Sequence, residues 1–297
     1  MEYVKWQKRR NLPVLKIFIL LILLILFLLI CVFLHYILKN DSGNEIPPRP
    51  VMQNNTQILT YDRLIRISED YLLLINNEHK IPQNISGDLV KVTDYVKTLK
   101  TDNLLNENAA VMLKEMLDAA AADAKYTEFR VTEGYRTREY QQSLYDSATD
   151  KSLVALPDYS EHQTGFAVDI SYNGVNIGNS RQGKWLADNS YKYGFILRYP
   201  KNKEHITGIS FEPWHYRYIG QPHAYFCYKN DLCLEEYIDY LKGKKEISVK
   251  FNGIEYMIYY LSDTGEIIGI PQNYSYSASS DNTGGIIITF KKPLDVK

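Results

Sequence analysis

Apolar residues follow three patterns along this chain, and the first is an apolar run over residues 17–34 that continues past His35 to residue 38. About 18 apolar residues in a helix span the hydrocarbon core of a bilayer, so the run predicts a transmembrane anchor over 17–38. Five Lys and Arg residues precede the run and only Lys39 follows it closely, which predicts a cytoplasmic tail over 1–16 and an extracytoplasmic remainder. A cleaved signal peptide is the alternative, but its apolar region would be shorter and would end at a small-residue cleavage site.

The second pattern lies between residues 59 and 244, where helical spacing alternates with short strand-like segments. Thr60 is a suitable N-cap for a first helix, and the segment 71–75 fits either its continuation or a buried strand. An apolar stripe on an Ala-rich segment predicts a longer helix over 106–126. Further periodicities predict helices over 140–148, 184–193 and 234–241, and strands over 129–132, 165–171 and 209–211.

The third pattern is strict alternation at the C-terminal end. Apolar residues alternate over 247–251 and again over 254–258, and Asn252-Gly253 between them is a strong type I′ hairpin signal. Residues 285–290 supply another strand. The pattern predicts a small β module over 245–297, and the polar, Pro-rich stretch over 39–58 predicts a linker after the anchor.

Composition narrows the possible functions without naming one. The chain is 45% apolar and 23% charged, which is ordinary for a globular protein and excludes disorder as a description of the whole. With 34 Lys and Arg against 35 Asp and Glu, it has no basic field for nucleic acid. Three cysteines are too few for a disulfide scaffold, and we expect no bridge between Cys227 and Cys233.

Two short segments carry an unusual density of reactive groups: Ser-Glu-His-Gln-Thr-Gly-Phe-Ala-Val-Asp over 160–169 and Glu-Pro-Trp-His over 212–215. On the strand prediction, Asp169 shares a face with small residues, which leaves room for a cleft. Pro213 bends the second segment, so that its Glu and His can reach one site. Two imidazoles with one carboxylate form an established zinc ligand set, and the extra carboxylate could act as a base. Spacing alone does not decide which carboxylate has which role.

These segments, which fit S-x-H-x-x-G-x-A-x-D and E-x-W-H, resemble the VanY-type zinc D,D-carboxypeptidases and their L,D-carboxypeptidase and D-Ala-D-Ala dipeptidase relatives. The segment over 133–145 is similar to the family's G-Y-R-[ST]-x-x-x-Q-x-x-L-[YF], and the resemblance extends over about 70–243, with a similar C-terminal β tail. It implies an α+β fold: a compact domain of the hedgehog/D,D-peptidase type over 59–244 with a short antiparallel sheet, one preceding transmembrane helix and a small β module after it.

The resemblance also implies a role for each candidate residue. His162, Asp169 and His215 would hold one Zn²⁺ per chain, and Glu212 would be the general base. Arg136 would stabilise the oxyanion or bind the terminal carboxylate of the peptide. The other positions expected at the substrate are Gln141, Ser160 and, in the pocket wall, Trp214.

The implied reaction is hydrolysis of the terminal D-Ala from peptidoglycan stem pentapeptides, by an enzyme held by a single span in the bacterial cytoplasmic membrane with its catalytic domain outside. A contribution to glycopeptide (vancomycin) resistance would follow. No obligate protein partner and no nucleic acid are expected. The alternatives are an L,D-carboxypeptidase or a D-Ala-D-Ala dipeptidase on the same scaffold, and an inactive cell-wall-binding protein whose metal is structural.

Overall fold

The computed structural model describes residues 56–292, except residues 84, 86, 152, 153, 179, 263 and 273. The expected cytoplasmic tail (1–16), the transmembrane anchor (17–38) and the linker up to residue 55 lie outside the described residues. Within the described part of the chain, no helix combines the length and the apolar character that crossing a bilayer requires. The last three residues assigned to the linker belong to strand β1 (Thr56–Thr60).

The central sheet is antiparallel, with strand order β4–β5–β8–β7 and a short β6 paired with β5. The strands are β4 (Phe129–Glu133), β5 (Ala167–Tyr172), β6 (Val175–Asn176), β7 (Phe195–Leu197) and β8 (His215–Tyr218). Val168 and Ile170 of β5 are fully buried in the main hydrophobic core. Successive side chains of a strand point to opposite faces, so Ala167 and Asp169 lie on the other face, as the sequence predicts.

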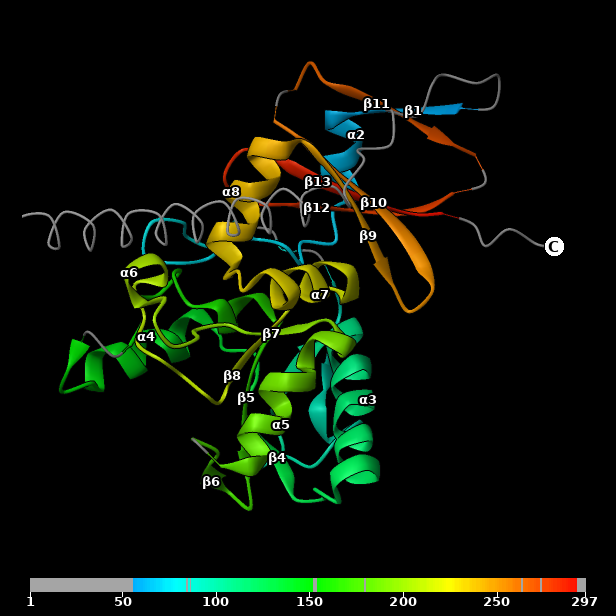
Figure 1. Cartoon of the computed structure of the whole chain (residues 1–297). Helices are drawn as coiled ribbons and strands as arrows, with labels where there is room; N and C mark the ends of the chain where they lie inside the picture. Colours follow the sequence, from blue (N-terminus) through cyan, green and yellow to red (C-terminus); the bar gives the residue numbers. More distant parts are fainter. Residues whose placement is uncertain are drawn as a thin grey trace, which may run out of the picture. The chain divides into compact units, whose positions relative to one another are not determined.

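Helices pack around this sheet and share its core (Figure 1). Asn106 caps the longest of them, α3, because its side chain accepts hydrogen bonds from two backbone N–H groups of the first turn. The predicted helices over 106–126, 140–148, 184–193 and 234–241 are all present within a few residues. The helices are α3 (Glu107–Ala124), α4 (Arg138–Ser147), α5 (Arg181–Asn189), α6 (Glu204–Thr207), α7 (Gln221–Asn230) and α8 (Leu234–Lys244), with 3₁₀ turns η1 (Val92–Asp94), η3 (Glu161–Thr164) and η4 (Ser190–Tyr193).

The C-terminal β module is an antiparallel sheet with strand order β12–β13–β10–β9. Its first hairpin turns at Asn252 and Gly253, whose φ angles of 50° and 76° are those of the predicted type I′ turn. The strand predicted over 285–290 is β13 (Ile286–Lys291), whereas the sequence analysis did not predict β11 and β12. The strands are β9 (Glu246–Phe251), β10 (Ile254–Leu261), β11 (Ile267–Pro271), β12 (Ser275–Ser280) and β13 (Ile286–Lys291).

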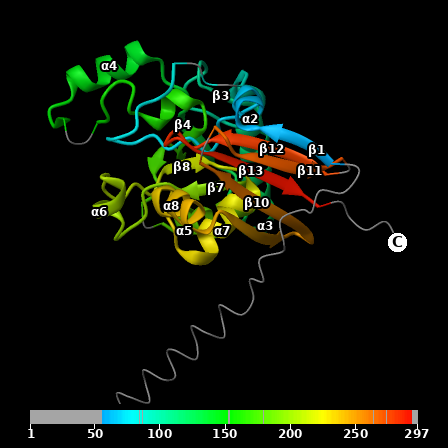
Figure 2. The ribbon, with the colours of Figure 1, turned by 90° about the horizontal axis from the view of Figure 1, so that it is seen from above.

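The first described residues join this module. Strand β1 pairs with β11, and helix α2 (Tyr61–Arg66) follows directly. Both views place β1 and α2 beside β11, β12 and β13 (Figure 1, Figure 2). Leu59 and Leu64 are fully buried there in a second hydrophobic cluster with residues of β10 to β13. A separate two-stranded sheet pairs β2 (Leu89–Lys91) with β3 (Leu104–Asn106).

Two local predictions need correction. The strand predicted over 209–211 is wrong: those residues form a loop, and the next strand, β8, begins only at His215. The first helix is capped by Thr60 as predicted but ends at Arg66. Residues 71–75 are buried, but they form neither a helix nor a strand. Cys227 and Cys233 are both buried and free, as expected.

Candidate active site and metal centre

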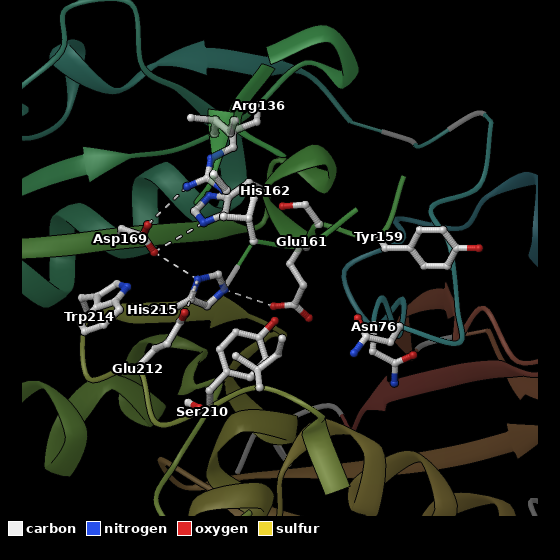
Figure 3. Close-up of a pocket in the computed structure, with 18 residues that line it drawn as sticks. Asn76, Arg136, Tyr159, Glu161, His162, Asp169, Ser210, Glu212, Trp214 and His215 are labelled. Atoms are coloured by element: carbon white, nitrogen blue, oxygen red, sulfur yellow. Dashed lines mark hydrogen bonds and ion pairs between the residues drawn. The ribbon is translucent and has the colours of Figure 1, made fainter. Parts of the chain in front are cut away.

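A cavity of about 390 Å³ lies on the face of the central sheet that carries Asp169 (Figure 3). Its lining brings together seven of the eight residues that the sequence singled out: Arg136, Ser160, His162, Asp169, Glu212, Trp214 and His215. They come from the β4–α4 connection, from η3 and its N-cap, from β5, and from the start of β8 with the turn before it. These segments are far apart along the chain. The eighth residue, Gln141, lies behind this lining.

His162 is placed by the 3₁₀ turn η3, which ends where Gly165 adopts a φ of 76°. This left-handed conformation strains a residue with a side chain, so the turn favours glycine at position 165. The Nδ1 atom of His162 lies 2.8 Å from the carbonyl oxygen of Gly134. Because a carbonyl only accepts, Nδ1 carries the proton and Nε2 keeps its lone pair. That Nε2 lies 3.4 Å from Asp169 Oδ1.

Asp169 and His215 face each other because β5 and β8 pair with these residues directly opposite. His215 Nδ1 is 3.1 Å from Asp169 Oδ1, and the two imidazole rings are 4.9 Å apart between centroids. One ligand atom from each of His162, Asp169 and His215 lies within 4.8 Å of the other two. The structure therefore brings the three predicted metal ligands together.

Asp169 Oδ1 shows that these residues fit a metal ion. The atom is buried between two imidazole nitrogens, yet it accepts no hydrogen bond of acceptable geometry. Buried carboxylate oxygens normally have partners, and a divalent cation between the three side chains would supply one. Two imidazoles and a carboxylate are a ligand set typical of catalytic zinc, with a fourth position left for a reactant.

Glu212 lies at the edge of this cluster. The chain turns over 212–215, and the His215 N–H donates to the Glu212 carbonyl at 3.3 Å. The turn, which contains Pro213 and Trp214, brings Glu212 Oε2 to 3.6 Å from His215 Nδ1. Burial raises the pKa of the Glu212 carboxyl above its usual range. A carboxylate with a raised pKa beside a metal site is suited to accept and return a proton.

Arg136 reaches the cluster from the opposite side. Its Nη2 is 3.7 Å from Asp169 Oδ2, and its Nε is 3.6 Å from Glu133 Oε2. Its Nη1 donates to Gln141 Oε1 at 3.2 Å, and the Gln141 amide donates to the Ala155 carbonyl at 2.7 Å. Gln141 is fully buried, so both ends of its amide serve to hold Arg136 and the loop around Ala155.

A buried charged group behind His215 escaped the sequence analysis. Glu161, which also lines the cavity, lies against His215 and accepts hydrogen bonds from Arg198 and Arg217. The signal was present, because in the pattern His-Tyr-Arg-Tyr over 215–218 strand alternation places Arg217 on the same face as His215. Arginine is rarely buried, so this alternation alone does not indicate a buried position for Arg217.

The protonation states of the three candidate ligands differ. Burial lowers the pKa of His162 below its usual range, and the Arg136 charge adds to the effect. Burial disfavours a charged His215, but the adjacent Asp169 and Glu161 carboxylates raise its pKa to about 9. Burial likewise opposes ionisation of Asp169, yet the two imidazoles hold its pKa well below the usual carboxyl range. At neutral pH the metal-free site therefore holds a neutral His162, an ionised Asp169 and a protonated His215.

These protonation states predict that metal binding releases a proton. A metal ligand must be unprotonated, so zinc binding at pH 7 should release one proton, from His215. Apparent zinc affinity should rise about tenfold per pH unit from pH 7 towards 9 and level off above that value, because His215 is then already neutral. Calorimetry in buffers of different ionisation enthalpy measures the released proton. Binding at pH 7 without proton release would contradict the assignment of His215.

Comparisons with known proteins identify the family of this chain. Residues 102–221 match the family described as "VanY: D-alanyl-D-alanine carboxypeptidase". A "D-alanyl-D-alanine carboxypeptidase" of Enterococcus faecium is 35% identical over 255 residues, which cover 82% of this chain and 83% of that protein.

Solved structures show the same fold. The crystal structure of the vancomycin resistance D,D-dipeptidase VanXYg, in complex with a D-Ala-D-Ala phosphinate analogue, superposes with a TM-score of 0.69 at 28% identity and covers 80% of this chain and 98% of its own. The structure of the LdcB LD-carboxypeptidase gives a TM-score of 0.53 at 37% identity. The match covers 63% of this chain and 96% of the LdcB chain. The motifs, the fold and the extent of these matches confirm the resemblance, and the chain belongs to the VanY family of D-alanyl-D-alanine carboxypeptidases.

Proposed function

We propose that this protein is a zinc D,D-carboxypeptidase that removes the terminal D-Ala from peptidoglycan stem pentapeptides and binds one Zn²⁺ per chain. The observation that carries the proposal is the convergence of His162, Asp169 and His215 on one point of a cavity that Glu212 and Arg136 also line. A metal ion with a purely structural role would not require Glu212 or Arg136 beside it. The proposal is further supported by the Enterococcus faecium relative, which is named for this activity.

The chain's own residues can carry each proton and charge of the reaction. His162, Asp169 and His215 would hold the zinc ion, which would supply Lewis acidity for the scissile carbonyl and for a water molecule. Glu212 accepts the proton of the attacking water and donates it to the amine of the departing D-Ala. The Arg136 guanidinium either binds the terminal carboxylate or stabilises the oxyanion, since a planar fork suits both. Gln141 keeps the guanidinium in position.

The proposed setting follows from the N-terminal sequence. Residues 17–38 would anchor the chain in the bacterial cytoplasmic membrane with the catalytic domain outside, where the pentapeptide substrate is exposed. Removal of the terminal D-Ala would reduce the target of glycopeptide antibiotics and contribute to vancomycin resistance.

A second candidate, D-Ala-D-Ala dipeptidase activity, is favoured by the likeness to VanXYg, which covers 80% of this chain. The two activities differ in whether the cavity accepts a peptide that extends beyond the second-last residue. The L,D-carboxypeptidase alternative differs in the stereochemistry of that residue.

Substrate preference can be measured directly with the purified extracytoplasmic region. We expect D-Ala release from a UDP-linked pentapeptide, with at most weak activity on the tetrapeptide and on free D-Ala-D-Ala. Release only from the tetrapeptide would establish the L,D-carboxypeptidase alternative. Release only from the free dipeptide would establish the dipeptidase.

Two substitutions separate the base from the metal ligands. Glu212→Gln keeps the shape of the side chain but cannot accept the proton, so kcat should fall by about 10²- to 10⁴-fold while zinc content is unchanged. His215→Ala removes a ligand and should lose both zinc and activity. Turnover and metal content, the latter by elemental analysis, are measured on the same preparations. A Glu212→Gln variant with wild-type turnover would remove the proposed base.

A further inference from the structure

Four charged side chains form a buried network behind the metal centre: Glu161, Arg198, Arg217 and Glu235. The side chains of Glu161, Arg198 and Arg217 are fully buried, and that of Glu235 is 10% exposed. Their formal charges cancel. Burying ion pairs costs desolvation free energy that their attraction offsets only with good geometry, so such a network is weak evidence for a role in stability. Its placement against a metal ligand suggests a different role.

The two oxygens of Glu161 have separate tasks. Oε1 accepts hydrogen bonds from Arg198 Nε and Arg217 Nη1, both at 2.8 Å. Oε2 is directed at His215 and lies 3.4 Å from Nε2 (Figure 3). An ionised carboxylate only accepts hydrogen bonds, so the proton of the His215 imidazole is held on Nε2. The lone pair is then on Nδ1, the nitrogen that lies 3.1 Å from Asp169 Oδ1.

The rest of the network fixes the position of the Glu161 carboxylate. Arg198 also donates to both oxygens of Glu235 on α8, at 2.9 and 2.7 Å. Arg217 Nη2 donates to the carbonyls of Tyr71 and Leu73, at 3.2 and 2.9 Å. Ala167 lies opposite Arg217 in the β5–β8 pair, and its small side chain leaves room for the guanidinium. The carboxylate is thus held from two sides of the core.

We propose that Glu161 is a positioning residue of the metal centre, which fixes the tautomer and the ring orientation of His215 so that Nδ1 is presented to the metal. The inference rests on the proposed function, because it takes His215 to be a zinc ligand. Partners of this kind orient metal-ligating histidines, and their loss reduces metal affinity about 10- to 100-fold. A purely structural ion pair would not distinguish Glu161 from Glu235.

Glu161→Gln tests this role, with Glu235→Gln as the matched control. The glutamine of Glu161→Gln can take two orientations. If its amide oxygen accepts from the two arginines, its NH₂ group faces His215 Nε2. That NH₂ group donates to Nε2 and moves the imidazole proton to Nδ1. In the opposite orientation the NH₂ group faces two guanidinium groups, which is unfavourable because all of these groups are hydrogen-bond donors. Glu235→Gln perturbs the same arginine without touching His215.

Zinc affinity of the three proteins is measured by chelator competition at pH 7.5. We expect Glu161→Gln to bind zinc about 10- to 100-fold more weakly than wild type, and Glu235→Gln to stay within about threefold. Equal losses in both variants, or none in Glu161→Gln, would overturn the inference. A wild-type protein that binds no zinc would instead overturn the proposed function.

A second measurement needs no variant. Long-range ¹H–¹⁵N spectra of the zinc-loaded wild-type protein show which nitrogen of each histidine carries a proton. The inference requires a protonated Nε2 and a metal-bound Nδ1 for His215, and the reverse for His162. A metal-bound Nε2 at His215 would overturn it even if Glu161→Gln fails to fold.

Discussion

The antiparallel register of β5 with β8 sets Asp169 opposite His215, and the chemistry of the site depends on this pairing. Side chains of a strand alternate between its two faces, so a slip of one residue would bring Tyr216 to the position of His215. The opposite face of the sheet fixes this register. There Val168 and Tyr216 form the neighbouring pair, and both are fully buried in the core. The hydrophobic side of the sheet thus determines the geometry of the reactive side.

The segment around residues 71–76 links the site to the C-terminal β module. Arg217 binds two of its carbonyls from the site side. From the module, Ser279 Oγ accepts a hydrogen bond from the Leu72 N–H, and the carbonyl of Asp281 accepts one from the Leu74 N–H. The segment is buried without regular secondary structure, so these contacts replace the hydrogen bonds that a helix or strand would provide. The module therefore helps to hold this segment in place.

Sequence patterns predicted the parts of the fold that local rules determine. Alternation over 165–171 placed Asp169 on the correct face, and Asn252-Gly253 located a hairpin because its turn needs two positive φ angles. The strand predicted over 209–211 failed because alternation over three residues has no structural meaning without a partner strand. The ligand set followed from residue types and family motifs.

The network around Glu161 could not be predicted in the same way. Arg198 and Arg217 are charged residues that would normally be exposed, and their burial depends on Glu161 and Glu235 from other parts of the chain. Likewise, Gln141 matched a family position expected at the substrate, but only the tertiary structure shows its amide occupied by Arg136 and Ala155.

The central claim is that three side chains from η3, β5 and β8 bind one zinc ion at a single point. Anomalous diffraction from zinc-loaded crystals, collected at the zinc absorption edge, tests it most directly. The account predicts one peak per chain, about 2.0–2.2 Å from His162 Nε2, an Asp169 carboxylate oxygen and His215 Nδ1. A fully loaded crystal with the peak elsewhere, or with only one of these side chains in contact, would contradict it.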